Sequence, residues 1–150
     1  MGVAFTKHTA GISRQDRIKI MATECKVSLE NKPGTLAQVG TVLGDADVSI
    51  VAIQGFSRGE ESIVQFVPNN PDKAAAALKA AGIPNTSREV LIVEVLDEVC
   101  SLGDVALVMT SAGINIDSVY VTTAGHVVLA VDDLKGAIQV AEGMTVMAPD

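Results

Sequence analysis

The chain has 150 residues, of which 48% are apolar and only 3% are aromatic, and its formal net charge is −7. This length suits one ordinary domain or two very small ones, and the apolar fraction is sufficient for a packed core. The acidic charge and the scarcity of aromatic rings argue against nucleic acid as a direct partner, because its recognition depends on basic residues and stacking side chains.

The first twenty residues differ from the rest of the chain because basic side chains outnumber acidic ones. They show no strand or helix period, and we expect residues 1–22 to form an irregular tail. The segment lacks the continuous apolar stretch of a secretory signal, and no apolar run in the chain approaches the roughly 20 residues that span a bilayer. We therefore expect a cytoplasmic protein without a membrane partner. The charged residues of the segment are Lys7, Arg14, Asp16, Arg17 and Lys19.

Patterned sequence follows this tail. Apolar and polar residues alternate where we expect strands, and apolar residues recur at spacings of three and four where we expect helices. Asn70 is the expected N-cap of an Ala-rich helix that has Pro71 at its first position and stops at Gly82. The elements before it, in chain order, are a strand at 24–30, a turn at 31–34, a helix ending near Gly44, a strand at 48–56, a hairpin turn at 57–60 and a strand at 63–67.

The rest of the chain repeats this order of elements. Residues 27–55 can be aligned with residues 93–121 with the apolar register kept, and residues 71–83 with residues 132–144. We therefore expect an α+β protein in which a ferredoxin-like βαββαβ module is repeated twice, with antiparallel sheets and helices on one face. The identities in the first alignment are Val27/Val93, Leu36/Leu102, Val39/Val105, Val42/Val108, Ala46/Ala112 and Ile50/Ile116.

The expected boundaries place the first module at 23–90 and the second at 91–150. Only residues 86–96 have a strand pattern at the junction. This run is expected either to serve both modules as a shared strand or to contain two closely abutting strands. No Gly/Ser-rich linker separates the two modules.

One stretch of the first module carries a family resemblance. The run Asn-Lys-Pro-Gly-Thr-Leu-Ala at 31–37 stands between a strand and a short helix. With the phrase Ala-Asp-Val-Ser-Ile at 46–50 and its counterpart at 112–116, it resembles an ACT domain, and the resemblance covers residues 24–145. It implies a regulatory protein whose ligand lies at an interface, where this loop faces the second strand of a neighbouring module. That strand would contribute Ser49, where many relatives have Asn.

The same loop has a physical basis for binding a ligand. Pro33 fixes the exit of the loop, and Gly34 lets a ligand approach the backbone. The first N–H groups of the helix, near Gly34, Thr35 and Leu36, lack partners within the helix and attract a carboxylate. The side-chain carbonyl of Asn31 could accept a hydrogen bond from an ammonium group, so an amino acid is the expected ligand. A purely structural turn is the alternative.

The second module departs from this pattern at the corresponding loop. Asp-Glu-Val-Cys-Ser at 97–101 replaces the Pro-Gly motif, and its two acids would repel a ligand carboxylate. Asn115 remains as a polar candidate on the following strand. A second site would therefore consist of Asp97, Ser101 and Asn115, but we expect one site per chain.

Residue sets for catalysis, metal binding or a cofactor are missing from the sequence. No His, Cys or acidic residue stands at metal-ligand spacing from His8 or His126. Cys25 and Cys100 are far apart and form no redox or disulfide motif. No Gly-rich stretch ends in the Lys-Ser/Thr of a phosphate loop. We therefore expect no cofactor, no metal ion and no enzymatic activity.

Two functional hypotheses follow. In the first, the chain is a non-catalytic regulator that binds an amino acid and thereby alters its contact with a partner enzyme. In the second, it is a ligand-free assembly module that regulates a separate enzyme subunit by protein contact. Because the edges of an open antiparallel sheet invite pairing, we expect a homodimer formed through sheet edges or helices.

Overall fold

The computed structural model describes residues 20–94 and 101–144; residues 1–19, 95–100 and 145–150 are not described. By its contacts the chain divides into two compact units. We call Ala22–Glu89 together with Tyr120–Ala124 the first unit, and the described parts of the remaining chain the second unit. The fold is α+β with antiparallel strand pairs, which confirms this part of the predicted fold class.

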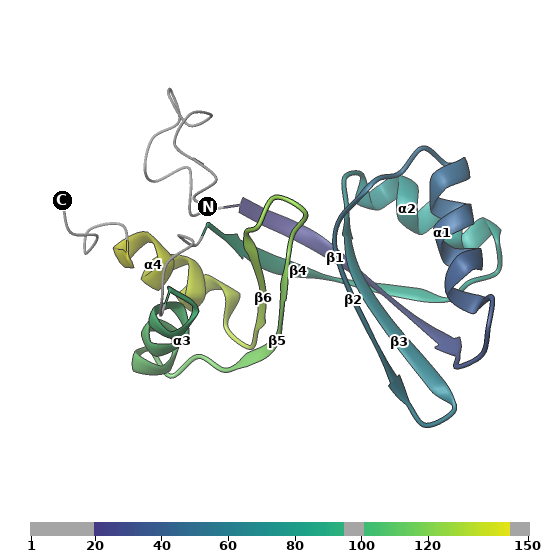
Figure 1. The fold of residues 1–150 in the computed structure, drawn as a ribbon. Coiled ribbons are helices and arrows are strands. Elements are labelled where there is room, and N and C mark those ends of the chain that lie inside the picture. The colour runs from purple at the N-terminus through teal and green to yellow at the C-terminus, as the bar shows by residue number, and fades with distance from the viewer. Residues whose placement is uncertain (1–19, 95–100, 145–150) are drawn as a thin grey trace, which may run out of the picture. The chain divides into compact units, whose positions relative to one another are not determined.

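In the first unit the strands follow the order β2-β3-β1-β4 (Figure 1). β3 pairs antiparallel with β1 on one side and with β2 on the other, so β2 is the edge strand of this unit. The elements are β1 (Ile20–Glu30), α1 (Thr35–Asp45), β2 (Ile50–Arg58), β3 (Glu61–Pro68), α2 (Pro71–Ala80) and β4 (Asn85–Val93). The start of β1, Ile20–Met21, and the end of β4, Val90–Val93, belong to the second unit.

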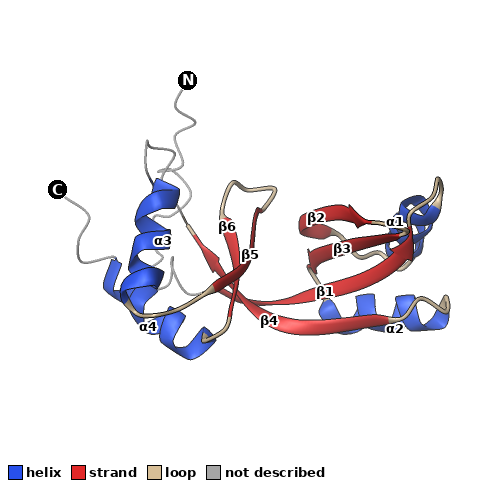
Figure 2. Ribbon diagram, turned by 90° about the horizontal axis from the view of Figure 1, so that it is seen from below, coloured by secondary structure: helices blue, strands red, loops and turns tan. Residues whose placement is uncertain are grey.

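The core of the first unit lies between its sheet and the helices α1 and α2 (Figure 2). Alternation along β1 sends Cys25 and Val27 to the helix side, and their partners on β3, Phe66 and Val64, face the same way. Phe66 has no exposed surface. The period of two in the sequence therefore buries one side of each strand against the helices. The buried core residues are Cys25, Val27, Val39, Leu43, Val48, Val64, Phe66, Ala74, Leu78 and Ile83.

In the second unit the strands follow the order β4-β6-β5, and β4 pairs antiparallel with β6. The elements here are α3 (Ser101–Ser111), β5 (Ile116–Val121), β6 (Val127–Val131) and α4 (Leu134–Met144). The last two residues of β5, Tyr120 and Val121, belong to the first unit. No helix in the described part of the chain is long and apolar enough to cross a membrane. The buried core residues are Leu91, Val93, Val105, Met109, Ile114, Val127, Leu129, Ala137 and Ala141.

Nine residues of one core correspond in position to nine of the other. Residues on the first strand, the first helix and the turn after it match at the spacing of the predicted repeat. The turns also match in detail: Val48 N–H donates to Leu43 O at 3.0 Å, and Ile114 N–H donates to Met109 O at 2.9 Å. The corresponding core pairs are Cys25/Leu91, Val27/Val93, Val39/Val105, Leu43/Met109, Val48/Ile114, Val64/Val127, Phe66/Leu129, Ala74/Ala137 and Leu78/Ala141.

The second helices align differently from the sequence prediction. Asn70 Oδ1 accepts from Lys73 N–H at 3.1 Å at the start of α2, and Asp133 Oδ1 accepts from Gly136 N–H at 2.9 Å at the start of α4. These caps pair residue 70 with residue 133, whereas the predicted alignment of 71–83 with 132–144 is wrong by two positions. Ala-rich helices match one another in several registers, and only the capping side chain fixes where the helix starts.

The first strand also differs from the prediction. β1 begins at Ile20, so it includes residues 20–22, which were expected to belong to the irregular tail. β1 has β4 as a neighbour, and this pairing continues the strand beyond the residues that alternate in the sequence. The rest of the expected tail lies outside the described residues.

The turn after α3 leads to a stability prediction. Gly113 has a φ of 71°, and a Cβ there would meet no atom within 4 Å, so Gly113→Ala adds only backbone strain. We expect a loss of about 1 kcal/mol in the free energy of unfolding. Gly103→Ala, within α3, is the matched control and should raise stability by about 0.5–1 kcal/mol. Denaturant titration measures both, and an unchanged midpoint for Gly113→Ala would contradict the prediction.

Candidate functional site

The loop at residues 31–34 joins β1 to α1 and is held by the hairpin turn between β2 and β3. The backbone N–H of Asn31 donates to Glu60 O at 2.8 Å. The side-chain Nδ2 of Asn31 donates to Gly59 O at 3.2 Å. This bond orients the side-chain amide, whose carbonyl oxygen Oδ1 is the atom that can accept a hydrogen bond from a ligand.

Gly34 is the N-cap of α1 and offers no side chain to the helix. Its φ is 93°, in the region that glycine favours, and no side chain caps the helix. The first backbone bond runs from Gln38 N–H to Gly34 O at 3.0 Å. The N–H groups of Thr35, Leu36 and Ala37 therefore have no partner within the helix.

The helices α2 and α4 begin in a different way. Asn70 caps α2, and Asp133 caps α4, each through a side-chain oxygen that accepts from a backbone N–H. These side chains fill the place that an anion would take at a helix N-terminus. The start of α1 keeps that place open for an acceptor from outside the helix.

Thr35 and Leu36, the first two residues of α1, add a hydroxyl bond to the loop and exposed apolar surface. The Thr35 hydroxyl lies 2.9 Å from Glu30 O and 3.0 Å from Lys32 O, and it donates to one of them at a time. This bond closes the loop onto the end of β1. Leu36 is 56% exposed and Pro33 is also exposed, so apolar surface lies beside the open N–H groups.

Lys32, within the loop, forms an ion pair with Glu30 at the end of β1. Lys32 Nζ lies 2.5 Å from Glu30 Oε2, and both side chains are exposed. The hydrogen bond from Lys32, together with its charge, lowers the pKa of Glu30. A ligand carboxylate would therefore be attracted here by the backbone N–H groups and the positive end of the α1 dipole rather than by a free lysine.

The structure brings the predicted loop residues together but places Ser49 elsewhere. Ser49 N–H donates to Asn69 Oδ1 at 3.0 Å, and Asn69 N–H donates back to Ser49 O at 3.0 Å. This pair lies at the Pro68 end of β3, whereas the loop lies at the Glu61 end. Within one module, Ser49 and the loop are thus at opposite ends of the sheet.

The second candidate site is only partly described. Asp97 lies outside the described residues, and Ser101 begins α3 without a described side chain. Asn115 N–H donates to Asp132 Oδ1 at 2.9 Å, and Asn115 Nδ2 donates to Asp117 Oδ1 at 3.0 Å. Asn115 therefore stabilises its turn in the same way as Ser49 does in the first unit.

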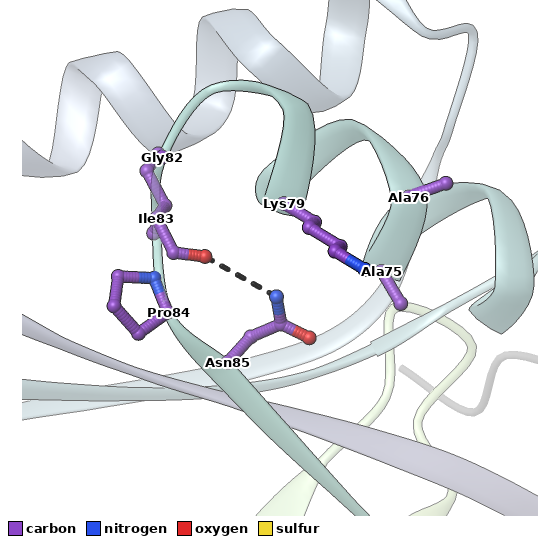
Figure 3. Close-up of a pocket in the computed structure, with 7 residues that line it drawn as sticks. All are labelled: Ala75, Ala76, Lys79, Gly82, Ile83, Pro84 and Asn85. Carbon is purple, nitrogen blue, oxygen red and sulfur yellow. Dashed lines mark hydrogen bonds between the residues drawn. The ribbon is translucent and has the colours of Figure 1, made fainter.

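A separate cavity of about 560 Å³ lies between the end of α2 and the start of β4 (Figure 3). Its polar side chains are Lys79 and Asn85, and Asn85 Nδ2 donates to Ile83 O at 3.2 Å. None of the predicted site residues lines it. The lining residues are Ala75, Ala76, Lys79, Gly82, Ile83, Pro84 and Asn85.

The first unit contains a buried polar network that the sequence did not predict. Glu24 is 1% exposed and lies on the sheet face opposite to Cys25, away from the helices. Its Oε1 accepts from Arg88 Nε at 2.7 Å and from Gln65 Nε2 at 3.3 Å, and its Oε2 accepts from Tyr120 OH at 2.6 Å. Gln65 Oε1 in turn accepts from Gln54 Nε2 at 2.6 Å.

This network shows no arrangement typical of catalysis. Burial, together with the charge of Glu24, raises the pKa of the neighbouring Cys25 thiol, so that it stays protonated and unreactive. Among the described residues, no three His, Cys, Asp or Glu side chains are grouped so that they could hold a metal ion. No sequence signal could have revealed the network, because Glu24 and Tyr120 are far apart in the chain and only the fold brings them together.

The network gives a second prediction. Tyr120 is the only tyrosine of the chain, and burial and its bond to Glu24 raise its pKa above the ordinary value of about 10. The unfolded chain therefore loses this proton at lower pH than the folded chain, and stability should fall as the pH rises above about 10. Phenolate absorbance should appear together with unfolding, as followed by circular dichroism. Ionisation of Tyr120 near pH 10 in the folded protein would contradict the described burial.

Residues 23–81 match the family model of the ACT domain. They contain the loop, the first two helices and the first three strands of the first unit, except the start of β1. Among curated proteins, none matches the sequence of the chain.

Several solved structures share the fold over most of the chain. Protein BT0572 from Bacteroides thetaiotaomicron is 22% identical with a TM-score of 0.78, over 84% of this chain and 90% of that chain. The regulatory subunit of aspartate kinase from Thermus thermophilus, in a ligand-free form, is 15% identical with a TM-score of 0.63, over 83% of this chain and 93% of that chain. At these identities the likeness concerns the fold. An ACT domain is therefore found at residues 23–81, within a fold that extends over both units.

Proposed function

We propose that this chain is a non-catalytic regulatory protein of two ACT-type modules, which binds an amino acid at residues 31–36. The observation that carries the ligand part is the start of α1, where Gly34 leaves the helix without a side-chain cap. A free backbone site at an exposed loop suits a small ligand that brings its own acceptor.

The chemistry of the loop favours an α-amino acid. Its carboxylate would accept from the N–H groups of Thr35 and Leu36, and its ammonium group would donate to Asn31 Oδ1. Leu36, exposed beside these groups, would contact an apolar part of the ligand. A ligand with a carboxylate but no ammonium group would bind more weakly, because it would lack the bond to Asn31 Oδ1. Lys32 is already paired with Glu30.

The regulatory part of the proposal draws on the structural neighbours. One of them is the regulatory subunit of aspartate kinase from Thermus thermophilus, and the likeness covers 93% of that chain. A protein of this kind acts by binding its ligand in one arrangement better than in another. By analogy, this chain would alter its contact with a partner enzyme when the ligand binds.

The matching cores support the proposal of two modules, at 23–90 and 91–150. Each core residue of the second unit has a counterpart in the first, and both second helices begin with a side-chain cap. The second module lacks the Pro-Gly motif and has acidic residues at 97 and 98, which would repel a carboxylate. We therefore propose one ligand site per chain.

The position of Ser49 makes the proposed site dependent on a neighbour. Since Ser49 lies at the far end of the sheet from the loop, its contact with a ligand requires another module or a second copy. A homodimer through sheet edges or helices would supply it. The alternative function is a ligand-free assembly module, for which the exposed Leu36 would be a protein contact.

A thermal unfolding screen against single amino acids at millimolar concentration tests this function. A ligand at about 100 times its Kd adds about 2.7 kcal/mol to the free energy of unfolding. For a chain of this size that is a rise of several degrees in Tm, at roughly 2–4 °C per kcal/mol. We expect a selective rise that Gly34→Val abolishes, because its side chain would cover the open N–H groups.

Gly82→Val is the matched control for this experiment. Gly82 also has a positive φ, 72°, and open space around it, so its substitution imposes similar strain. It lines the cavity beside α2 instead of the loop. A shift that survives Gly34→Val but not Gly82→Val would move the site to that cavity, and no shift with any amino acid would favour the assembly module.

A further inference from the structure

The cavity between the end of α2 and the start of β4, which we call the α2–β4 cavity, is large enough for a small ligand. Its volume is about 560 Å³, within the range of roughly 300–1,000 Å³ that is usual for such sites. The helix contributes only the methyl groups of Ala75 and Ala76 to this wall, so the space between helix and strand stays open. None of the residues that line the cavity is acidic.

The walls of the cavity are fixed by the turn that ends α2. Gly82 N–H donates to Lys79 O at 3.0 Å, and Ile83 N–H donates to Leu78 O at 2.9 Å. Gly82 has the positive φ, 72°, that this turn requires. Ile83 is 7% exposed and belongs to the core, and the ring of Pro84 restricts the backbone that leads into β4. The cavity is therefore formed before any ligand binds.

Lys79 provides a positive charge at one side of the cavity. A long side chain on a helix points back toward the N-terminus, and Figure 3 shows Lys79 running toward Ala75. This direction carries the ammonium group away from the C-terminal end of α2, where the negative end of the helix dipole would repel an anion. Lys73 on the same helix lies 3.9 Å from Asp47, whereas Lys79 forms no ion pair with any described residue.

Asn85 provides a hydrogen-bond acceptor at the other side of the cavity. Its Nδ2 donates to Ile83 O at 3.2 Å, which orients the side-chain amide. The carbonyl oxygen Oδ1 points away from Ile83 in Figure 3, and no donor from the described residues reaches it. The α2–β4 cavity thus places one unpaired cation and one unpaired acceptor on either side of an apolar wall.

We propose that the α2–β4 cavity binds a small hydroxy acid. Its carboxylate contacts Lys79 Nζ, its hydroxyl donates to Asn85 Oδ1, and its short apolar part lies against Ala75 and Ala76. A hydroxyl suits this place better than an ammonium group, because a second positive charge would lie near that of Lys79. The ligand belongs to a different class from the amino acid proposed for residues 31–36, and neither proposal depends on the other.

Titration of the labelled full chain with 2-hydroxy-3-methylbutanoate, followed by amide chemical shifts, tests the charged contact. We expect saturable shifts centred on Gly82, Ile83 and the side-chain amide of Asn85. Lys79→Met keeps an unbranched side chain in the helix but removes the charge, so it should weaken binding about tenfold or more. Lys73→Met is the matched control, because Lys73 lies on the same helix, does not line the cavity and should leave the affinity unchanged.

Two further comparisons test the apolar wall and the hydroxyl. Ala76→Leu places a larger side chain in the cavity while keeping a good helix former, and it should abolish binding. Ala80→Leu is its control, since Ala80 is an exposed alanine of α2 that does not line the cavity. The carboxylate without a hydroxyl, 3-methylbutanoate, should bind about two- to tenfold more weakly than the hydroxy acid.

Three results would overturn the proposal. The first is the absence of saturable shifts at the α2–β4 cavity, including the case in which shifts appear only at Gly34 and Thr35. The second is equal binding of inorganic phosphate together with unchanged binding in Ala76→Leu, which would show a surface contact of an anion with Lys79 alone. The third is a loss of binding that Lys73→Met or Ala80→Leu shares, because it would reflect a change in the whole helix.

Discussion

The carboxylate of Glu24 lies in the interior of the first unit, where a charge is tolerated only if hydrogen-bond donors surround it. Its donors come from Gln65 on β3, Arg88 on β4 and Tyr120, which follows a long stretch of intervening chain. The strands β1, β3 and β4 and the segment Tyr120–Ala124 must therefore adopt one mutual arrangement for the carboxylate to be satisfied. Helices cover one face of this sheet. On the opposite face, the Glu24 network holds Tyr120 in place through a hydrogen bond.

This rigid base explains how an exposed loop can hold a defined shape. Glu30, at the end of β1, pairs with Glu61 on β3, and the loop that follows is bonded to the hairpin turn between β2 and β3. Gly34 then enters α1 without a side chain, which leaves the helix N–H groups in fixed positions at the surface. The candidate site thus consists mainly of backbone groups, whose geometry depends on the sheet beneath them.

Local patterns predicted much of the fold and the part of the site that is contiguous in sequence. Alternation located β1 and β3, spacing of three and four located α1, and Asn70 marked the start of α2. The loop residues lie together because they are neighbours in the chain. In contrast, Glu24 occupies the polar face of an alternating strand and gave no sign of burial, since its cover comes from Tyr120. The separation of Ser49 from the loop likewise depends on strand direction in the folded sheet, which the motif does not contain.

The proposed function depends on whether the start of α1 binds a carboxylate-bearing ligand through its backbone N–H groups. The most direct measurement is the change in amide proton and nitrogen chemical shifts when an amino acid identified by thermal screening is added to the labelled protein. We expect saturable shifts centred on Gly34, Thr35 and Leu36, together with the side-chain amide of Asn31. Shifts centred on Gly82 and Asn85, or none near α1 at saturating ligand, would contradict it.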